Sequence, residues 1–137
     1  MASLRHLAIR CMDMEKSRTF YETAFDWKFI GYRPSGLGLD LSDGVNNITL
    51  LQQPDDCSRP VLDEGNEYIH FGVIVDDLKE CWQRLSDWGA EFSKDDVKSR
   101  NEIGDDWTPR RSFKVLDPDG NVVDVTEYKE EWRGVTL

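Results

Sequence analysis

The chain has 137 residues and a formal net charge of −10, and 39% of its residues are hydrophobic. This length fits one globular domain with its own core, and the negative charge disfavours a nucleic-acid backbone or a membrane surface as partner. The first residues lack a signal-peptide pattern and no apolar run reaches the length of a membrane span, so we expect a cytoplasmic protein.

The first part of the chain, at about 3–53, predicts a module of one helix and four strands. Asp13 is a suitable N-cap for a helix over 16–25, which carries an apolar stripe at helical spacing. Alternation and turn residues predict the four strands at 4–10, 27–32, 38–41 and 47–53. The order of elements is therefore β-α-β-β-β.

The same order is predicted again after a linker at 54–66. The second module, at about 67–128, has a helix over 77–88 that ends at Gly89. Its strands are expected at 68–75, within 90–98, and at 111–116 and 122–128. The tail at 129–137 has no clear assignment, and the whole chain of 1–137 is expected to form one domain.

The two modules repeat each other at an offset of 64 residues, which superposes His6 on His70. These are the only two histidines in the chain, and each falls on the first strand of its module. The next residue on each histidine face is very small, Ala8 or Gly72, which leaves room for a ligand above the imidazoles. A duplicated unit with an imidazole on each first strand indicates a bound metal.

The last strand of each module supplies further polar candidates. Gln52 and Asp124 are expected to face the same space as the two histidines. Two imidazoles, one carboxylate and one amide oxygen suit a divalent transition metal with open positions for water or substrate.

Three motifs cover nearly the whole chain to about residue 128. They are L-R-H-L-A-I-R followed by D-M-E-K-S-R-T-F-Y-E-T-A-F-D-W-K-F at the start, Y-I-H-F-G-V-I-V-D-D-L in the middle, and R-R-S-F-K-V-L-D-P-D-G-N-V-V-D-V near the end. In this order they resemble the vicinal oxygen chelate superfamily, which includes glyoxalase I, extradiol dioxygenases, methylmalonyl-CoA epimerase, and fosfomycin- and bleomycin-resistance proteins. The resemblance implies an α+β fold in which two β-α-β-β-β modules form a cupped, eight-stranded mixed sheet with a metal inside.

The resemblance also implies a ligand set for a divalent ion such as Fe, Ni, Zn, Mn or Co. The family's first-strand positions match His6 and His70, and its fourth-strand position in the second module matches Asp124. In the first module Gln52 is the best match, with Gln53 one register slip away. Glyoxalase-like enzymes usually have carboxylates at both fourth-strand positions, whereas an amide cannot act as a base near neutral pH.

The polar loop at 101–111, between the second and third strands expected in the second module, is the next candidate. In a family-like fold Trp107, Arg110 and Arg111 would lie near the mouth of the site, where an arginine could hold a substrate carboxylate or phosphate. The alternative is that Asp105 and Asp106 neutralise these arginines in an exposed loop.

The leading hypothesis is a lyase or isomerase of the glyoxalase type that acts on a small molecule chelated to the metal through vicinal oxygens. Asp124 or a metal-bound hydroxide would then move the proton. One alternative is an Fe(II)-dependent extradiol-type dioxygenase with His6, His70 and Asp124 as its triad. Another is a non-catalytic small-molecule or drug-binding protein of the bleomycin-resistance type. The resemblance also implies a homodimer, with the site built within one chain or across two.

Overall fold

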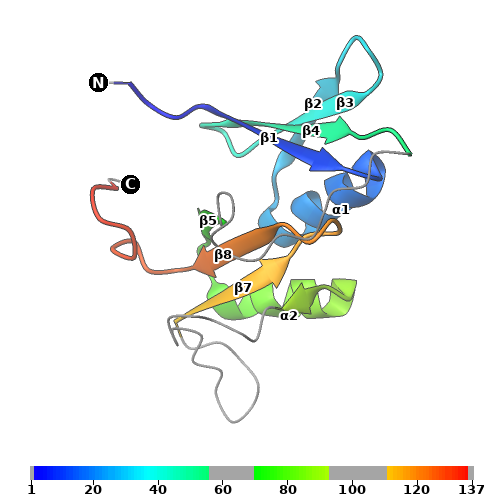
Figure 1. The fold of residues 1–137 in the computed structure, drawn as a ribbon. Coiled ribbons are helices and arrows are strands. Elements are labelled where there is room, and N and C mark those ends of the chain that lie inside the picture. The colour runs from blue at the N-terminus through cyan, green and yellow to red at the C-terminus, as the bar shows by residue number, and fades with distance from the viewer. Residues whose placement is uncertain (1, 56–69, 93–110, 136–137) are drawn as a thin grey trace. The chain divides into compact units, whose positions relative to one another are not determined.

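The computed structural model describes residues 2–55, 70–92 and 111–135 of the chain. The chain divides into two compact units, Met1–Val61 and Leu62–Leu137. Within the described residues, each unit has one helix and four strands in the order β-α-β-β-β (Figure 1). The duplicated module expected from the sequence is therefore confirmed.

The first unit forms a four-stranded mixed sheet in the order β1-β4-β3-β2, with β1 parallel to β4 and the other pairs antiparallel. Its helix is α1, Met14–Phe25. Its strands are β1 His6–Cys11, β2 Lys28–Tyr32, β3 Gly38–Ser42 and β4 Asn47–Gln52.

The second unit repeats this topology in the order β5-β8-β7-β6, with β5 parallel to β8. Its helix is α2, Leu78–Trp88. Its strands are β5 Phe71–Ile74, β6 Glu91–Phe92, β7 Ser112–Leu116 and β8 Val122–Thr126. The described strands thus hydrogen-bond as two four-stranded sheets, one in each unit.

Equivalent caps begin the two helices. The side chain of Asp13 accepts a hydrogen bond from the backbone N–H of Lys16 at 3.0 Å, and Asp77 accepts one from Glu80 at 2.8 Å. Each bond satisfies a backbone donor that the first helical turn would otherwise leave unpaired. Gly89 ends α2 with a φ of 88°, in the left-handed region that favours glycine. Neither helix in the described part of the chain has the length and apolar character of a membrane span.

Each helix covers one face of its own sheet. In the first unit Phe20, Tyr21 and Ala24 of α1 are fully buried, as are Leu39 and Leu50 on the neighbouring strands. In the second unit the Trp82 ring of α2 stacks on Phe92, with centroids 3.9 Å apart, and meets Phe113 edge-on at 5.3 Å. These contacts are apolar, so the polar residues of the strands are left on the opposite faces.

Candidate functional site

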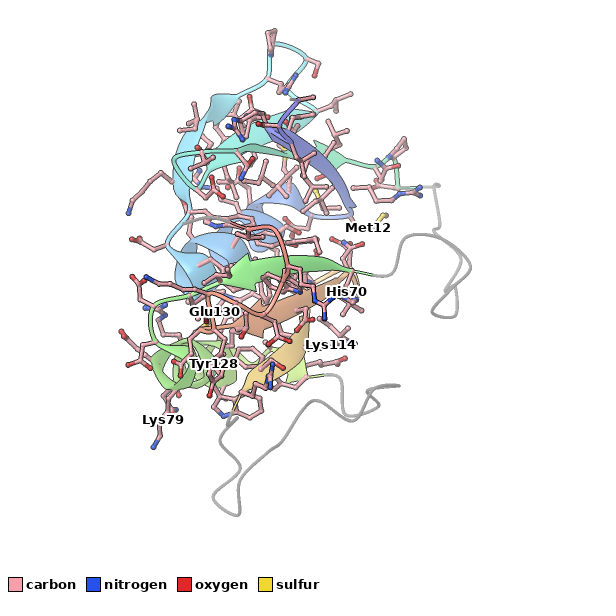
Figure 2. The ribbon with its side chains drawn as sticks, turned by 90° about the vertical axis from the view of Figure 1, so that its left-hand side faces the viewer. Met12, His70, Lys79, Lys114, Tyr128 and Glu130 are labelled. Carbon is pink, nitrogen blue, oxygen red and sulfur yellow. The ribbon has the colours of Figure 1, made fainter. Side chains whose placement is uncertain are left out.

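The second unit brings two of the predicted ligands together. His70 immediately precedes β5, and Gly72 on that strand is paired in register with Asp124 on β8. Residues two apart on a strand share a face, so His70 and Asp124 lie on the face opposite to Phe113 and α2. His70 Nε2 lies 3.6 Å from Asp124 Oδ2. Figure 2 shows His70 at the start of β5.

The geometry of this pair fits a divalent ion. Two donors that each lie about 2.1 Å from one ion stand about 3.0 to 3.4 Å apart. The observed 3.6 Å separation is close to that range and exceeds an ordinary hydrogen bond. The side chains of His70 and Asp124 are 30% and 18% exposed, so a ligand can reach them. His70 Nδ1 is buried without a hydrogen-bond partner among the described residues, which leaves Nε2 as the nitrogen available to an ion.

The described residues contain no group of three histidine, cysteine, aspartate or glutamate side chains that could hold a metal. Among residues 70–92 and 111–135, the donors that the structure brings together are therefore His70 and Asp124. Both donors are of types that first-row divalent ions accept.

His6 has a defined orientation in the first unit. Its Nδ1 lies 2.6 Å from Oδ1 of Asn47, its register partner on β4. Because the amide oxygen can only accept, the proton lies on Nδ1 and the lone pair lies on Nε2. A hydrogen bond of this kind orients metal-binding histidines in other proteins. The Nε2 lone pair of His6 is therefore available to a bound group.

A polar network continues across the same face of the first sheet. The Thr49 hydroxyl donates to Asp40 Oδ1 at 2.6 Å and accepts from Arg33 at 2.8 Å, while Arg33 also donates to Asp40. Burial raises the pKa of Asp40, but hydrogen bonds from Thr49, Asn47 and Arg33 outweigh it and hold the pKa below its usual range. The face that carries His6 is therefore ionic and hydrogen-bonded.

Gln52 does not lie on the face of His6. It is paired in register with Cys11, so it shares the helix-covered face with Leu50. Its amide oxygen accepts from the backbone N–H of Met14 at 2.9 Å, and its amide nitrogen donates to the carbonyl of Met12. Gln52 therefore joins the end of β4 to the start of α1, and the expectation that it faces the same space as His6 is not met.

Gln53 follows Gln52 directly and is the residue that strand alternation assigns to the face of His6. Its backbone N–H donates to the carbonyl of Cys11 at 2.8 Å, so the parallel ladder extends to this residue. Gln53 nevertheless lies beyond Cys11, about 20 Å along the strand from His6 at about 3.3 Å per residue, so the two side chains do not meet at one ion.

Arg111 forms an ion pair with a residue of its own unit. Its Nε and Nη2 both donate to Oε2 of Glu131, at 3.1 and 3.0 Å, and its guanidinium lies 5.5 Å from the centroid of Tyr128. Arg111 therefore holds the C-terminal tail, while its substrate-binding role stays a prediction. Trp107 and Arg110 lie outside the described residues.

The sequence did not indicate two further residues that lie on the sheet face carrying His70 and Asp124. Lys114 is paired in register with Asp124 and is only 8% exposed (Figure 2). Its alternation with Phe113 and Val115 on β7 was the available signal. Trp132, in the tail, contacts Gly72. The tail has no counterpart in the first module, so the repeat could not reveal it.

The sequence of the chain is similar to those of several known proteins. A family model described as Glyoxalase/Bleomycin resistance protein/Dioxygenase superfamily matches residues 3–125. The glyoxalase domain-containing protein RDO1 of Mycosarcoma maydis is 28% identical over 130 residues, covering 93% of this chain and 69% of that protein. A probable trivalent organoarsenical cleaving enzyme of Bacillus subtilis (strain 168) is 28% identical over 120 residues, covering 85% of this chain and 73% of that protein.

Solved structures share the fold. A mutant of the fosfomycin resistance protein FosX from Listeria monocytogenes, complexed with Mn(II) and 1S,2S-dihydroxypropylphosphonic acid, has a TM-score of 0.66 and 16% identity, covering 96% of this chain and 94% of that chain. Lactoylglutathione lyase from Agrobacterium tumefaciens has a TM-score of 0.59 and 17% identity, covering 92% of this chain and 93% of that chain. The α+β fold expected from the sequence is thereby confirmed.

The lowered pKa of Asp40 predicts a pH-dependent contribution to stability. Its carboxylate stabilises the fold above the unfolded-state pKa of about 3.9, and that stabilisation is lost as the pH falls through the lower folded-state pKa. The difference in unfolding free energy between wild type and D40N, from urea denaturation, should be constant above about pH 5 and shrink below it. T49V should raise the pKa of Asp40 in an NMR titration. A D40N difference that grows with acidity would contradict this account.

Proposed function

Because the chain belongs to the Glyoxalase/Bleomycin resistance protein/Dioxygenase superfamily, we propose that it is a metal-dependent lyase or isomerase of the glyoxalase type. The family inferred from the three sequence motifs is confirmed over residues 3–125. The observation that carries the functional proposal is the His70–Asp124 pair, whose donor atoms lie 3.6 Å apart on the sheet face opposite to α2. The substrate that we propose is a small molecule with two neighbouring oxygens.

We assign His70 Nε2 and Asp124 Oδ2 as ligands of a divalent ion, drawn from Fe, Ni, Zn, Mn and Co. His6 stays a candidate ligand from the sequence repeat alone, and its hydrogen bond from Nδ1 to Asn47 leaves Nε2 for an ion. Neither Gln52 nor Gln53 joins a site with His6, because both lie at the opposite end of β4 from Asn47, the register partner of His6. The Mn(II) in the FosX complex supports a divalent ion on this fold.

The ion, when bound, supplies Lewis-acid stabilisation of the negative charge that develops on the substrate oxygens. The chain supplies the proton transfer. Asp124 Oδ2 faces His70, and we assign the second carboxylate oxygen to accept a proton from the substrate carbon and return it. Lys114, paired with Asp124 on the same face, places a positive charge that favours an anionic substrate.

We expect both H70A and D124A to lower the affinity for Co(II) by about 100-fold or more, since loss of even a supporting residue around a metal typically costs 10- to 100-fold. Equilibrium dialysis and the visible absorption of Co(II) measure this change. D87N is the matched control, because Asp87 is an exposed carboxylate of α2 that contacts Gln83. H70A protein that still binds a full equivalent of Co(II) with wild-type affinity would refute the assignment.

The two glutamines should differ in what their removal changes. Q53A should leave both Co(II) affinity and the free energy of unfolding nearly unchanged, because Gln53 lies far along the strand from His6. Q52A should also leave Co(II) affinity unchanged but lower the free energy of unfolding by about 1–3 kcal/mol, because the bonds to Met14 and Met12 are lost. Dialysis and urea denaturation on both variants test this contrast. Loss of Co(II) affinity in either variant would contradict this account and restore that glutamine as a ligand candidate.

Proton transfer can be followed by the exchange of a carbon-bound hydrogen of the substrate for deuterium. Co(II)- or Ni(II)-loaded protein incubated in D₂O with a set of α-hydroxy carbonyl compounds should exchange a carbon-bound proton next to the chelated oxygens, and NMR detects that loss of signal. D124N should lower the exchange rate at least about 100-fold if its carboxylate is the base. Oxygen consumption with catechols under Fe(II), without such exchange, would instead establish a dioxygenase.

A further inference from the structure

The C-terminal tail is anchored to the second unit. The N–H of Tyr128 donates to the Thr126 hydroxyl at 3.1 Å, and the N–H of Glu131 donates to the Tyr128 carbonyl at 3.1 Å. The Glu131 side chain is only 5% exposed and receives both hydrogen bonds from Arg111, which directly precedes β7. Because this pair is buried on one side and doubly bonded, it fixes the tail immediately before Trp132.

The indole of Trp132 lies against Gly72. A Cβ atom built on Gly72 would overlap both Cη2 and Cζ2 of the indole, well inside van der Waals contact. Only glycine at this position therefore accommodates the ring. Gly72 is the register partner of Asp124 and stands two residues after His70, so the indole contacts the strand between the two donors of the pair.

The indole covers this position only in part. Gly72 remains exposed and Trp132 is half-buried, so the space beside the ring stays accessible to solvent. The sequence predicted that the absent side chain of Gly72 leaves room for a ligand. In the structure the indole of Trp132 itself occupies the position that a side chain at Gly72 would take.

We propose that Trp132 is a specificity-determining residue that forms one wall of the ligand site at His70 and Asp124. The wall excludes bulky groups from the space over Gly72 and selects small aliphatic compounds with vicinal oxygens over aromatic ones. This inference rests on the proposed function, because it concerns ligands held by a metal at that pair. It narrows the substrate class of the same site.

Two hydroxamates test the wall in the full-length, Co(II)-loaded protein. Acetohydroxamate and benzohydroxamate chelate through the same pair of oxygens and differ in a methyl against a phenyl group. We expect W132A to shift the ratio of their dissociation constants toward benzohydroxamate by about tenfold or more, as removal of a pocket wall does. Changes in the visible absorption of Co(II) report both affinities.

G72A probes the same contact from the other side, because its methyl group displaces the indole without removing it. It should shift the ratio in the same direction as W132A. W88A is the matched control, since Trp88 is a half-buried tryptophan at the end of α2 and should leave the ratio unchanged.

The results of these measurements distinguish the proposed role of Trp132 from the proposed metal-dependent function. An unchanged ratio in W132A and G72A, with Co(II) bound normally, would overturn the role of Trp132 and leave the metal proposal intact. A wild-type preference for benzohydroxamate that W132A abolishes would also overturn it, because the indole would then be a stacking surface. If wild-type protein binds no Co(II), the proposed function fails and this inference fails with it.

Discussion

The parallel pairing of β5 with β8 is the constraint on which the candidate site depends. Register partners in neighbouring strands turn their side chains to the same face, so the pairing of Gly72 with Asp124 places that carboxylate beside His70. A slip of one residue would turn Asp124 toward the helix-covered face, where Phe113 and Val125 are buried. The apolar packing under α2 therefore enforces the register that brings the two donors together.

The same constraint operates in the first unit, where it assigns two adjacent glutamines to opposite faces of the sheet. Gln52 falls on the helix-covered face and satisfies backbone groups around the start of α1. Alternation assigns Gln53 to the other face, but at the opposite end of β4 from Asn47 and His6. Adjacent strand residues with the same side chain thus acquire different chemistry, because alternation gives each a different set of neighbours.

The second unit departs from the first in its tail, and this difference shapes the candidate site. Arg111 pairs with Glu131 and so holds the tail against the sheet, and Trp132 contacts Gly72. Gly72 therefore has a packing role that the repeat alone does not indicate. An arginine expected to bind substrate also positions the residue to which we assign ligand selection.

The sequence by itself determined the duplicated β-α-β-β-β order, the capping residues Asp13 and Asp77, and the family, because periodicity and caps are local properties of the chain. It also predicted that His70 and Asp124 face the same side of the second sheet, as the pairing of β5 with β8 places them. Only the tertiary structure decided that Gln52 turns away from His6, that Arg111 holds the tail and that Trp132 contacts Gly72. These outcomes depend on strand register and on contacts between residues far apart in the chain, neither of which local patterns specify.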